Sequence, residues 1–164
     1  MREMKRKNNI FYKKIFTYFT SDKLYLKGKK TNLLLSCKQY NSIIKKSDQL
    51  LLEEKLFLNN NLTIVELAKE VGTNRTYLYK SIKCVKNQSF SQYINNNRIE
   101  YSKQLIKETL YNSETGIDNS GMTTEDYAIA SGFSSGRNFV RWFKLKEGIT
   151  PTQYKNALLW KVRE

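Results

Sequence analysis

The stretch from Met122 to Tyr154, MTTEDYAIASGFSSGRNFVRWFKLKEGITPTQY, repeats an earlier stretch from Leu62 to Tyr93, LTIVELAKEVGTNRTYLYKSIKCVKNQSFSQY. Up to a glycine, matching residues are 60 positions apart: Thr63 with Thr123, Ala68 with Ala128, and Gly72 with Gly132. Beyond the glycine they are 61 positions apart: Leu78 with Phe139, Asn87 with Gly148, Ser89 with Thr150, and Tyr93 with Tyr154. One residue is therefore inserted after the glycine, and the chain holds two copies of one structural unit.

Each copy begins with the signature of a helix start. Thr63 is followed three residues later by Glu66, and Thr123 by Asp126. A hydroxyl with an acid three residues on is a capping box, in which both side chains satisfy free backbone N–H groups. Apolar residues then recur at helical spacing, so one face of this first helix must pack against another element.

A tight turn and a second helix follow in both copies. Gly72 and Gly132 fall where the chain must reverse, because glycine adopts the left-handed backbone conformation without steric cost. Asn74 and Ser134 are predicted to cap the second helix. That helix is expected to bury two apolar residues in each copy, Leu78 with Ile82 and Phe139 with Phe143. Two short helices joined by such a turn predict a DNA-binding helix-turn-helix.

The second copy resembles the signature of AraC/XylS-type transcriptional regulators. The matching residues are Ala128, Gly132-Phe133, Ser134-Ser135, Phe139, Phe143-Lys144, Gly148, Thr150-Pro151 and Tyr154. The resemblance covers roughly residues 50 to 160, and the first copy departs from it at Ile82 and Asn87. It implies an all-α, homeodomain-like DNA-binding domain with two helix-turn-helix subdomains joined by a long linker helix.

The linker is expected from Phe90 to about Leu110, with Ser89 as its cap. The residues of one helix face recur there at spacings of three and four: Phe90, Tyr93, Ile94, Arg98, Ile99, Ser102, Leu105 and Ile106. In the family such a helix fixes the separation of the two units. Arg98 is interpreted as a partly buried structural ion pair rather than a base reader.

We expect four segments. Residues 1–45 are a basic extension, partly helical and partly disordered, and residues 46–110 are the first helix-turn-helix unit plus the linker helix. A polar loop spans 111–121, and the second unit spans 122–164. Ser47 is predicted to cap the helix preceding the first unit, and Pro151 to open a final helix that buries Trp160.

The outer faces of the two second helices supply candidate DNA contacts. By the resemblance, base contacts fall on Thr76, Tyr79 and Lys80 in the first unit, where Arg75 also points outward. The corresponding positions of the second unit are Gly136, Arg137, Val140 and Arg141, and the two arginines suit guanine. The residues expected to contact phosphates are Lys83, Lys86, Asn138, Lys144 and Lys146. A polar residue on an exposed helix face is ordinarily just solvated, so the helix-turn-helix context carries this assignment.

Charge and composition narrow the class of function. The chain has 164 residues and a net charge of +14, which favours a polyanionic partner. Residues 1–50 hold 13 Lys and Arg against 3 Asp and Glu, so +10 of that charge precedes the repeats. There is no histidine, only two cysteines, and no phosphate loop, so we expect no enzyme activity, no metal and no cofactor.

The expected protein is a bacterial, cytoplasmic, sequence-specific transcription regulator that binds double-stranded DNA as a monomer. RNA polymerase is a candidate second partner, and no small-molecule site or membrane span is evident. Either the activity of such a short regulator is controlled through its own synthesis, or residues 1–50 are the end of a longer sensor domain. The alternative is a non-specific basic protein that binds nucleic acid or anionic membrane through residues 1–50, with the repeats as scaffold.

Overall fold

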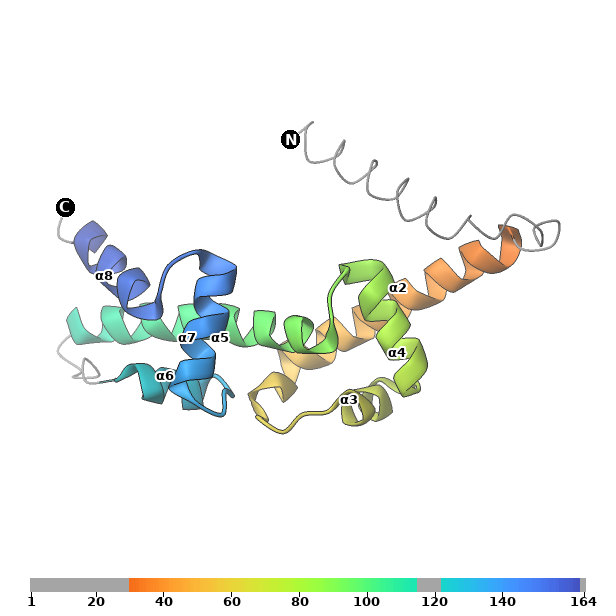
Figure 1. Cartoon of the computed structure of the whole chain (residues 1–164), viewed down its shortest axis with the longest axis horizontal. Helices are drawn as coiled ribbons and strands as arrows, with labels where there is room; N and C mark the ends of the chain where they lie inside the picture. Colours follow the sequence, from red (N-terminus) through yellow and green to blue (C-terminus); the bar gives the residue numbers. More distant parts are fainter. Residues whose placement is uncertain (1–29, 115–121, 163–164) are drawn as a thin grey trace, which may run out of the picture. The chain divides into compact units, whose positions relative to one another are not determined.

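The computed structural model describes the backbone of residues 30–114 and 122–162, and the side chains of 38–110 and 122–160. Every regular element in these ranges is helical (Figure 1). In chain order they are α2 (Lys30–Glu53), the 3-10 turn η1 (Leu56–Leu58), α3 (Ile64–Val71), α4 (Arg75–Ser81), the π-helical turn η2 (Ile82–Lys86), α5 (Phe90–Glu114), α6 (Thr124–Ala130), α7 (Gly136–Glu147) and α8 (Pro151–Val162). The predicted all-α fold with two helix-turn-helix units and a long linker helix is confirmed.

The chain divides into two compact units, Met1–Lys38 and Gln39–Glu164. Residues 1–29 of the predicted basic extension lie outside the described residues. The predicted boundary at residue 45 does not coincide with an end of a helix, because α2 runs through it without a break. Ile44, 3% exposed, already belongs to the core of the first helix-turn-helix unit.

The prediction that Ser47 caps a helix is wrong. Ser47 lies inside α2 and is fully buried, and its hydroxyl donates to the carbonyl of Ile43 at 2.8 Å. A serine bonded to the carbonyl four residues back is satisfied within a continuous helix, so it marks no helix start. The helix instead ends at Glu53, and Lys55 adopts a left-handed conformation, with φ of 49°, that leads into η1.

The duplication extends further back than the sequence comparison found, because it includes the helix before each helix-turn-helix. At an offset of 55 residues, Ile44, Ser47 and Leu51 of α2 match Ile99, Ser102 and Ile106 of α5, and all six are buried. Each serine donates its hydroxyl to a carbonyl of the preceding turn. Each unit is therefore a bundle of three helices, α2–α4 and α5–α7, in which α5 both opens the second unit and closes the first.

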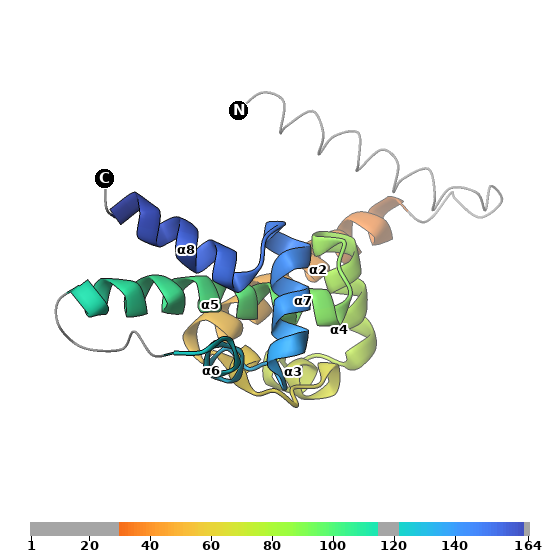
Figure 2. The same cartoon turned by 60° about the vertical axis from the view of Figure 1, so that its left-hand side comes forward.

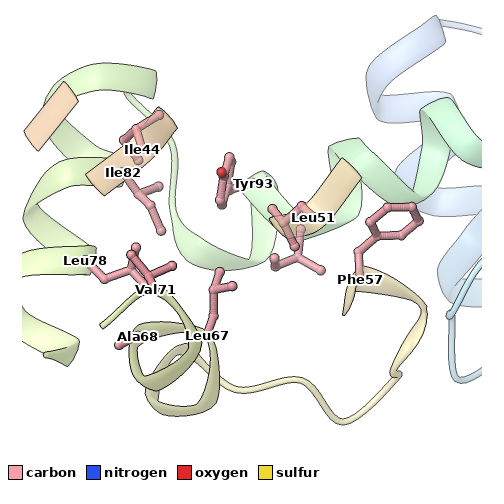
Figure 3. Packing of buried hydrophobic residues seen from close by; sticks show 10 residues of the cluster. Ile44, Leu51, Phe57, Leu67, Ala68, Val71, Leu78, Ile82 and Tyr93 are labelled. Carbon is pink, nitrogen blue, oxygen red and sulfur yellow. The ribbon is translucent and has the colours of Figure 1, made fainter. Parts of the chain in front are cut away.

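Two apolar cores hold these bundles. Figure 3 shows the first, in which α2, η1, α3, α4, η2 and the start of α5 contribute Ile44, Leu51, Phe57, Leu67, Ala68, Val71, Leu78, Ile82, Tyr93 and Ile94. The second core contains Ile99, Ile106, Tyr127, Ala128, Phe133, Phe139 and Phe143. The rings of Phe139 and Phe143 meet edge to face with their centroids 5.6 Å apart. Burying each large apolar side chain stabilises the fold by about 1.5–3 kcal/mol.

Four helices begin with reciprocal caps in which a hydroxyl and a side chain three residues on satisfy each other's backbone N–H. The pairs are Thr63 with Glu66, Ser89 with Gln92, Thr123 with Asp126, and Thr150 with Gln153. The hydrogen bonds from the backbone N–H and hydroxyl of Thr63 hold the pKa of Glu66 below its usual range. The predicted cap at Ser89 and both predicted capping boxes are confirmed.

The two ends of the second unit differ from expectation. Helix α5 continues to Glu114, so the first four residues of the predicted loop 111–121 are helical, and 115–121 lie outside the described residues. Pro151 opens α8, as predicted. The expectation that Trp160 is buried is wrong, because 72% of it is exposed. Figure 2 shows α8 extending beyond α7, and the helices that α8 contacts are α5 and α7.

Replacing Ser131 with alanine is expected to raise the free energy of unfolding by about 1 kcal/mol, measured by urea denaturation. The Ser131 hydroxyl is fully buried and has no hydrogen-bond partner among the described residues. An unpaired buried hydroxyl is costly, and the φ of −96° suits alanine. The matched control is Ser102→Ala, whose hydroxyl donates to Ile99, so it should give no such gain. A loss of stability in Ser131→Ala would contradict the conclusion that the Ser131 hydroxyl is unpaired.

Candidate nucleic-acid interface

The first recognition helix presents a polar face to solvent. Asn74 caps α4 by accepting a hydrogen bond from the Tyr77 N–H, as predicted. Leu78 and Ile82 lie in the core and are at most 1% exposed. The residues predicted to contact bases, Arg75, Thr76, Tyr79 and Lys80, are all exposed. Because the buried pair fixes the rotation of the helix, these four side chains form its outward face.

The second recognition helix follows the same plan with one correction. Ser135, not the predicted Ser134, caps α7 and accepts from the Asn138 N–H. Phe139 and Phe143 are fully buried. Arg137 and Arg141 are exposed, while Gly136 is buried and Val140 is half-buried. The guanidinium of Arg141 lies 5.8 Å from the centroid of the Trp142 ring, which favours one orientation of this arginine.

The recognition helices of the two units have matching bounds. Residues 75–86, which are α4 continued by η2, correspond at the offset of 61 to residues 136–147 of α7. The residue that follows each is left-handed, Asn87 with φ of 54° and Gly148 with φ of 78°. Asparagine tolerates this conformation better than most residues, so the departure at Asn87 leaves the helix end intact. Both units therefore present a helix of the same length.

The predicted phosphate contacts divide into two groups. Lys83 and Lys144 are exposed, and neither forms an ion pair with another residue of the described part of the chain. Lys86 instead pairs with Asp48 of α2 at 2.7 Å, and Lys146 pairs with Glu100 of α5 at 2.7 Å. A phosphate would have to displace an internal carboxylate from each of these two lysines. Asn138, the remaining candidate, is half-buried in the first turn of α7.

Asp48 joins three helical elements of the first unit. Its two oxygens accept from the Tyr93 hydroxyl at 2.6 Å and from Lys86 at 2.7 Å. Burial, and then the hydrogen bond to Asp48, raise the pKa of Tyr93, so this hydroxyl stays protonated and donates. The contact fixes the end of the recognition helix against α2 and the start of α5. The sequence offers no signal for it, because the partners are 38 and 45 residues apart.

A group of alternating charges fixes the end of α7 on α5. Lys103 lies 3.1 Å from Glu147 and 3.3 Å from Glu100, which also binds Lys146. Burial raises the pKa of Glu100, but the hydrogen bonds and charges of Lys146 and Lys103 outweigh burial and hold its pKa below the usual range. For Lys103, burial lowers the pKa, and the two carboxylates outweigh that and raise it. Glu100 and Lys103 therefore both stay charged near neutral pH.

Arg98 joins the two helix-turn-helix units. Its guanidinium donates to the carbonyls of Phe57 at 2.7 Å and Asn59 at 2.8 Å, and its carbon lies 5.6 Å from the Phe133 ring centroid. The predicted ion pair is wrong, because the partners are the backbone carbonyls of Phe57 in η1 and of Asn59, which follows η1, together with the Asn95 side chain. Burial lowers the pKa of Arg98, yet a guanidinium keeps its charge in proteins.

The turn of the second unit touches the same segment. Gly132 has φ of 81°, and a Cβ added there would lie 2.7 Å from the backbone of Leu58. No side chain fits in that space, so this glycine has a second role besides the left-handed turn that the sequence predicted. The guanidinium of Arg98 and the backbone contact of Gly132 together fix the second unit against η1.

None of the helices in residues 30–114 and 122–162 combines the length and the apolar character needed to cross a bilayer. Among the same residues, no group of acids and cysteines is arranged to hold a metal ion.

Comparison with known proteins places this arrangement in a family. A family profile described as a helix-turn-helix domain matches residues 67–157, more than half of the chain. An uncharacterized HTH-type transcriptional regulator, YtdP of Bacillus subtilis (strain 168), is 31% identical over 96 residues, which are 58% of this chain. The match spans only 11% of that relative's length.

Two solved structures share the fold. The C-terminal domain of AraT, a response regulator from Geobacillus stearothermophilus, has a TM-score of 0.55 and 21% identity, and the match covers 71% of this chain and 84% of that one. The DNA-binding domain of AdpA, a global transcriptional factor in complex with a target DNA, has a TM-score of 0.55 and 15% identity, covering 74% and 95%. At these identities the likeness is one of fold.

Proposed function

Because this chain belongs to the AraC-type family of helix-turn-helix transcription regulators, we propose that it binds double-stranded DNA in a sequence-specific manner as a monomer. In this proposal α4 and α7 enter two successive segments of the major groove, whose faces on one side of the duplex lie about 34 Å apart. A regulator of this kind acts in the bacterial cytoplasm, where the chromosome is.

The observation that carries the proposal is the division of both recognition helices into a buried apolar face and an exposed cationic one. Lys80 and the two arginines, Arg137 and Arg141, suit the O6 and N7 acceptors of guanine. The methyl group of Thr76 suits thymine, while Tyr79 and Arg75 suit base edges or nearby phosphates. Lys83 and Lys144 are the proposed primary phosphate contacts, and Asn138 is a further candidate. Lys86 and Lys146 would contribute only by breaking internal ion pairs.

Selection of binding sites from random duplex DNA tests the proposal, with the intact chain at about 150 mM salt, where non-specific binding is weakened. We expect two short preferred segments about one helical turn apart. Recovery of no common sequence would contradict it.

Replacing Lys80 or Arg141 with alanine is expected to weaken binding to the selected site about 5- to 150-fold, because each side chain discriminates a base pair by about 1–3 kcal/mol. Each substitution should relax the preference at one position only. The matched control is Lys144→Ala, which should weaken binding to all sequences alike and lower the salt dependence by about one counterion. Fluorescence anisotropy titrations at several salt concentrations measure both effects. Equal losses on selected and scrambled DNA for Arg141→Ala would contradict its role.

A second candidate function follows from the +10 charge of residues 1–50, which suits non-specific binding to nucleic acid or anionic membrane. Removing residues 1–38 distinguishes the two functions. The cut belongs after Lys38 because a deletion through residue 45 would also remove Ile44 from the first core. Sequence preference should survive this deletion under the first proposal, and all binding should disappear under the second.

A further inference from the structure

The first turn of α7 holds a carboxylate that comes from the neighbouring helix. The Gly136 N–H donates to Glu125 Oε2 of α6 at 2.8 Å. A Cβ added to residue 136 would overlap that oxygen and lie 3.3 Å from the carboxyl carbon. Glu125 remains exposed while Gly136 is buried. The missing side chain at residue 136 is therefore what allows the Glu125 carboxylate to reach the recognition helix.

The first unit is built differently at this point. The residue equivalent to Glu125 is Val65, which is apolar and 59% exposed, and the residue equivalent to Gly136 is Arg75, which is also exposed. In α4 the first turn therefore carries a long cationic side chain of its own. In α7 the equivalent position, residue 136, has no side chain, and the anionic side chain of Glu125 from α6 occupies the space. At this one position the two units present side chains of opposite charge, while α7 carries a cation of its own at the next residue, Arg137.

Residues at the start of a recognition helix contact base edges in the major groove. One oxygen of Glu125 is fixed by the Gly136 amide, and Oε1 has no hydrogen-bond partner among the described residues. A carboxylate only accepts hydrogen bonds, and the major-groove partner that it suits is the N4 amino group of cytosine.

We propose that Glu125 is a specificity-determining residue that selects cytosine in the half-site bound by α7, in the place that Gly136 leaves open. This assignment rests on the proposed function. The same carboxylate accepts the hydrogen bond of the Gly136 N–H, which is therefore not available to a phosphate of the DNA backbone.

Binding-site selection with five forms of the intact chain tests the assignment: the natural sequence, Glu125→Gln, Gly136→Ala, Glu108→Gln and Arg141→Ala. The half-site of α7 is identified as the one whose preference changes in Arg141→Ala. In the natural chain we expect about tenfold enrichment of cytosine at one position of that half-site. Glu125→Gln should lose this preference or shift it toward adenine, because an amide both donates and accepts.

Gly136→Ala should also lose the cytosine preference, because its methyl group displaces the carboxylate while leaving Glu125 in the chain. The atom it meets is the end of a flexible side chain, so the fold should persist, which a thermal melt checks. Glu108→Gln removes the same charge from an exposed position of α5 and should keep the cytosine preference.

Three outcomes overturn the assignment: unchanged base preference in Glu125→Gln, cytosine retained in Gly136→Ala, or equal tightening on all sequences, which would indicate general repulsion of phosphate. A natural chain that selects no sequence at all would instead contradict the proposed function itself.

Discussion

Replacing Arg98 with alanine is expected to lower the free energy of unfolding by about 3 kcal/mol. The side chain is 8% exposed and donates to two carbonyls of the segment that follows α2, so its loss removes the donor of a buried bond to Phe57 and of a partly buried bond to Asn59. Hydrogen bonds to a charged group contribute about 1.5–3 kcal/mol each, and the contact with the Phe133 ring is lost as well. Urea denaturation followed by circular dichroism measures the change.

Arg137→Ala is the matched control, because that arginine is exposed on α7 and should change stability by no more than about 0.5 kcal/mol. Arg98→Lys keeps the charge but not the planar fork that spans the two carbonyls, so it should recover only part of the loss. A change below about 1 kcal/mol in Arg98→Ala would mean that the junction contributes little. Under the proposed function, this variant should also tolerate altered spacing between the two half-sites better than the natural chain does.

Replacing Gly132 with alanine is expected to cost about 3 kcal/mol, for two separable reasons. Its φ of 81° disfavours any side chain, and the new methyl group would lie 2.7 Å from backbone atoms of Leu58 and Phe57, which cannot rotate away. The chain offers a control that isolates the first reason. Gly148 has nearly the same φ, 78°, and no atom within 4 Å of an added Cβ.

Gly148→Ala should therefore cost only about 1–2 kcal/mol, the strain of a left-handed alanine. The difference between the two alanine variants in urea denaturation then measures the contact between the turn of the second unit and η1. Equal losses would show that Gly132 is needed for its conformation alone, and that the close approach to Leu58 relaxes without cost.

The repeated helix-turn-helix could be predicted from the sequence because each of its signals is local. A capping residue lies three positions from its partner, as in Thr63 and Glu66. The turn is signalled by a glycine at the position that needs a left-handed backbone. The outward faces of α4 and α7 followed from the spacing of buried residues such as Leu78 and Phe139. The exposure of these faces is confirmed except at Gly136, which is buried, and Val140, which is half-buried, and their contacts with DNA stay a prediction.

The remaining features depend on contacts between distant residues. Arg98 binds backbone carbonyls, which every residue has, so nothing in the sequence distinguishes them from a carboxylate partner. In the sequence Lys86 and Lys146 are indistinguishable from solvated surface lysines, because their partners Asp48 and Glu100 approach them only in the folded chain. Ser134 and Ser135 are equally good caps, and only the inserted residue decides between them. The carboxylate of Glu125 reaches Gly136 across the turn, a contact that neither residue indicates alone.

The position of α8 has a consequence for how the molecule opens. Thr150 and Tyr154 repeat Ser89 and Tyr93, so α8 closes the second unit as the start of α5 closes the first. Trp160 then takes the place of the fully buried Ile99, but is uncovered. The described chain is thus a short tandem array in which each unit packs against the helix that follows it. Fraying that begins at α8 would uncover the second unit, while the first unit, α2–α4, would stay closed by the early turns of α5.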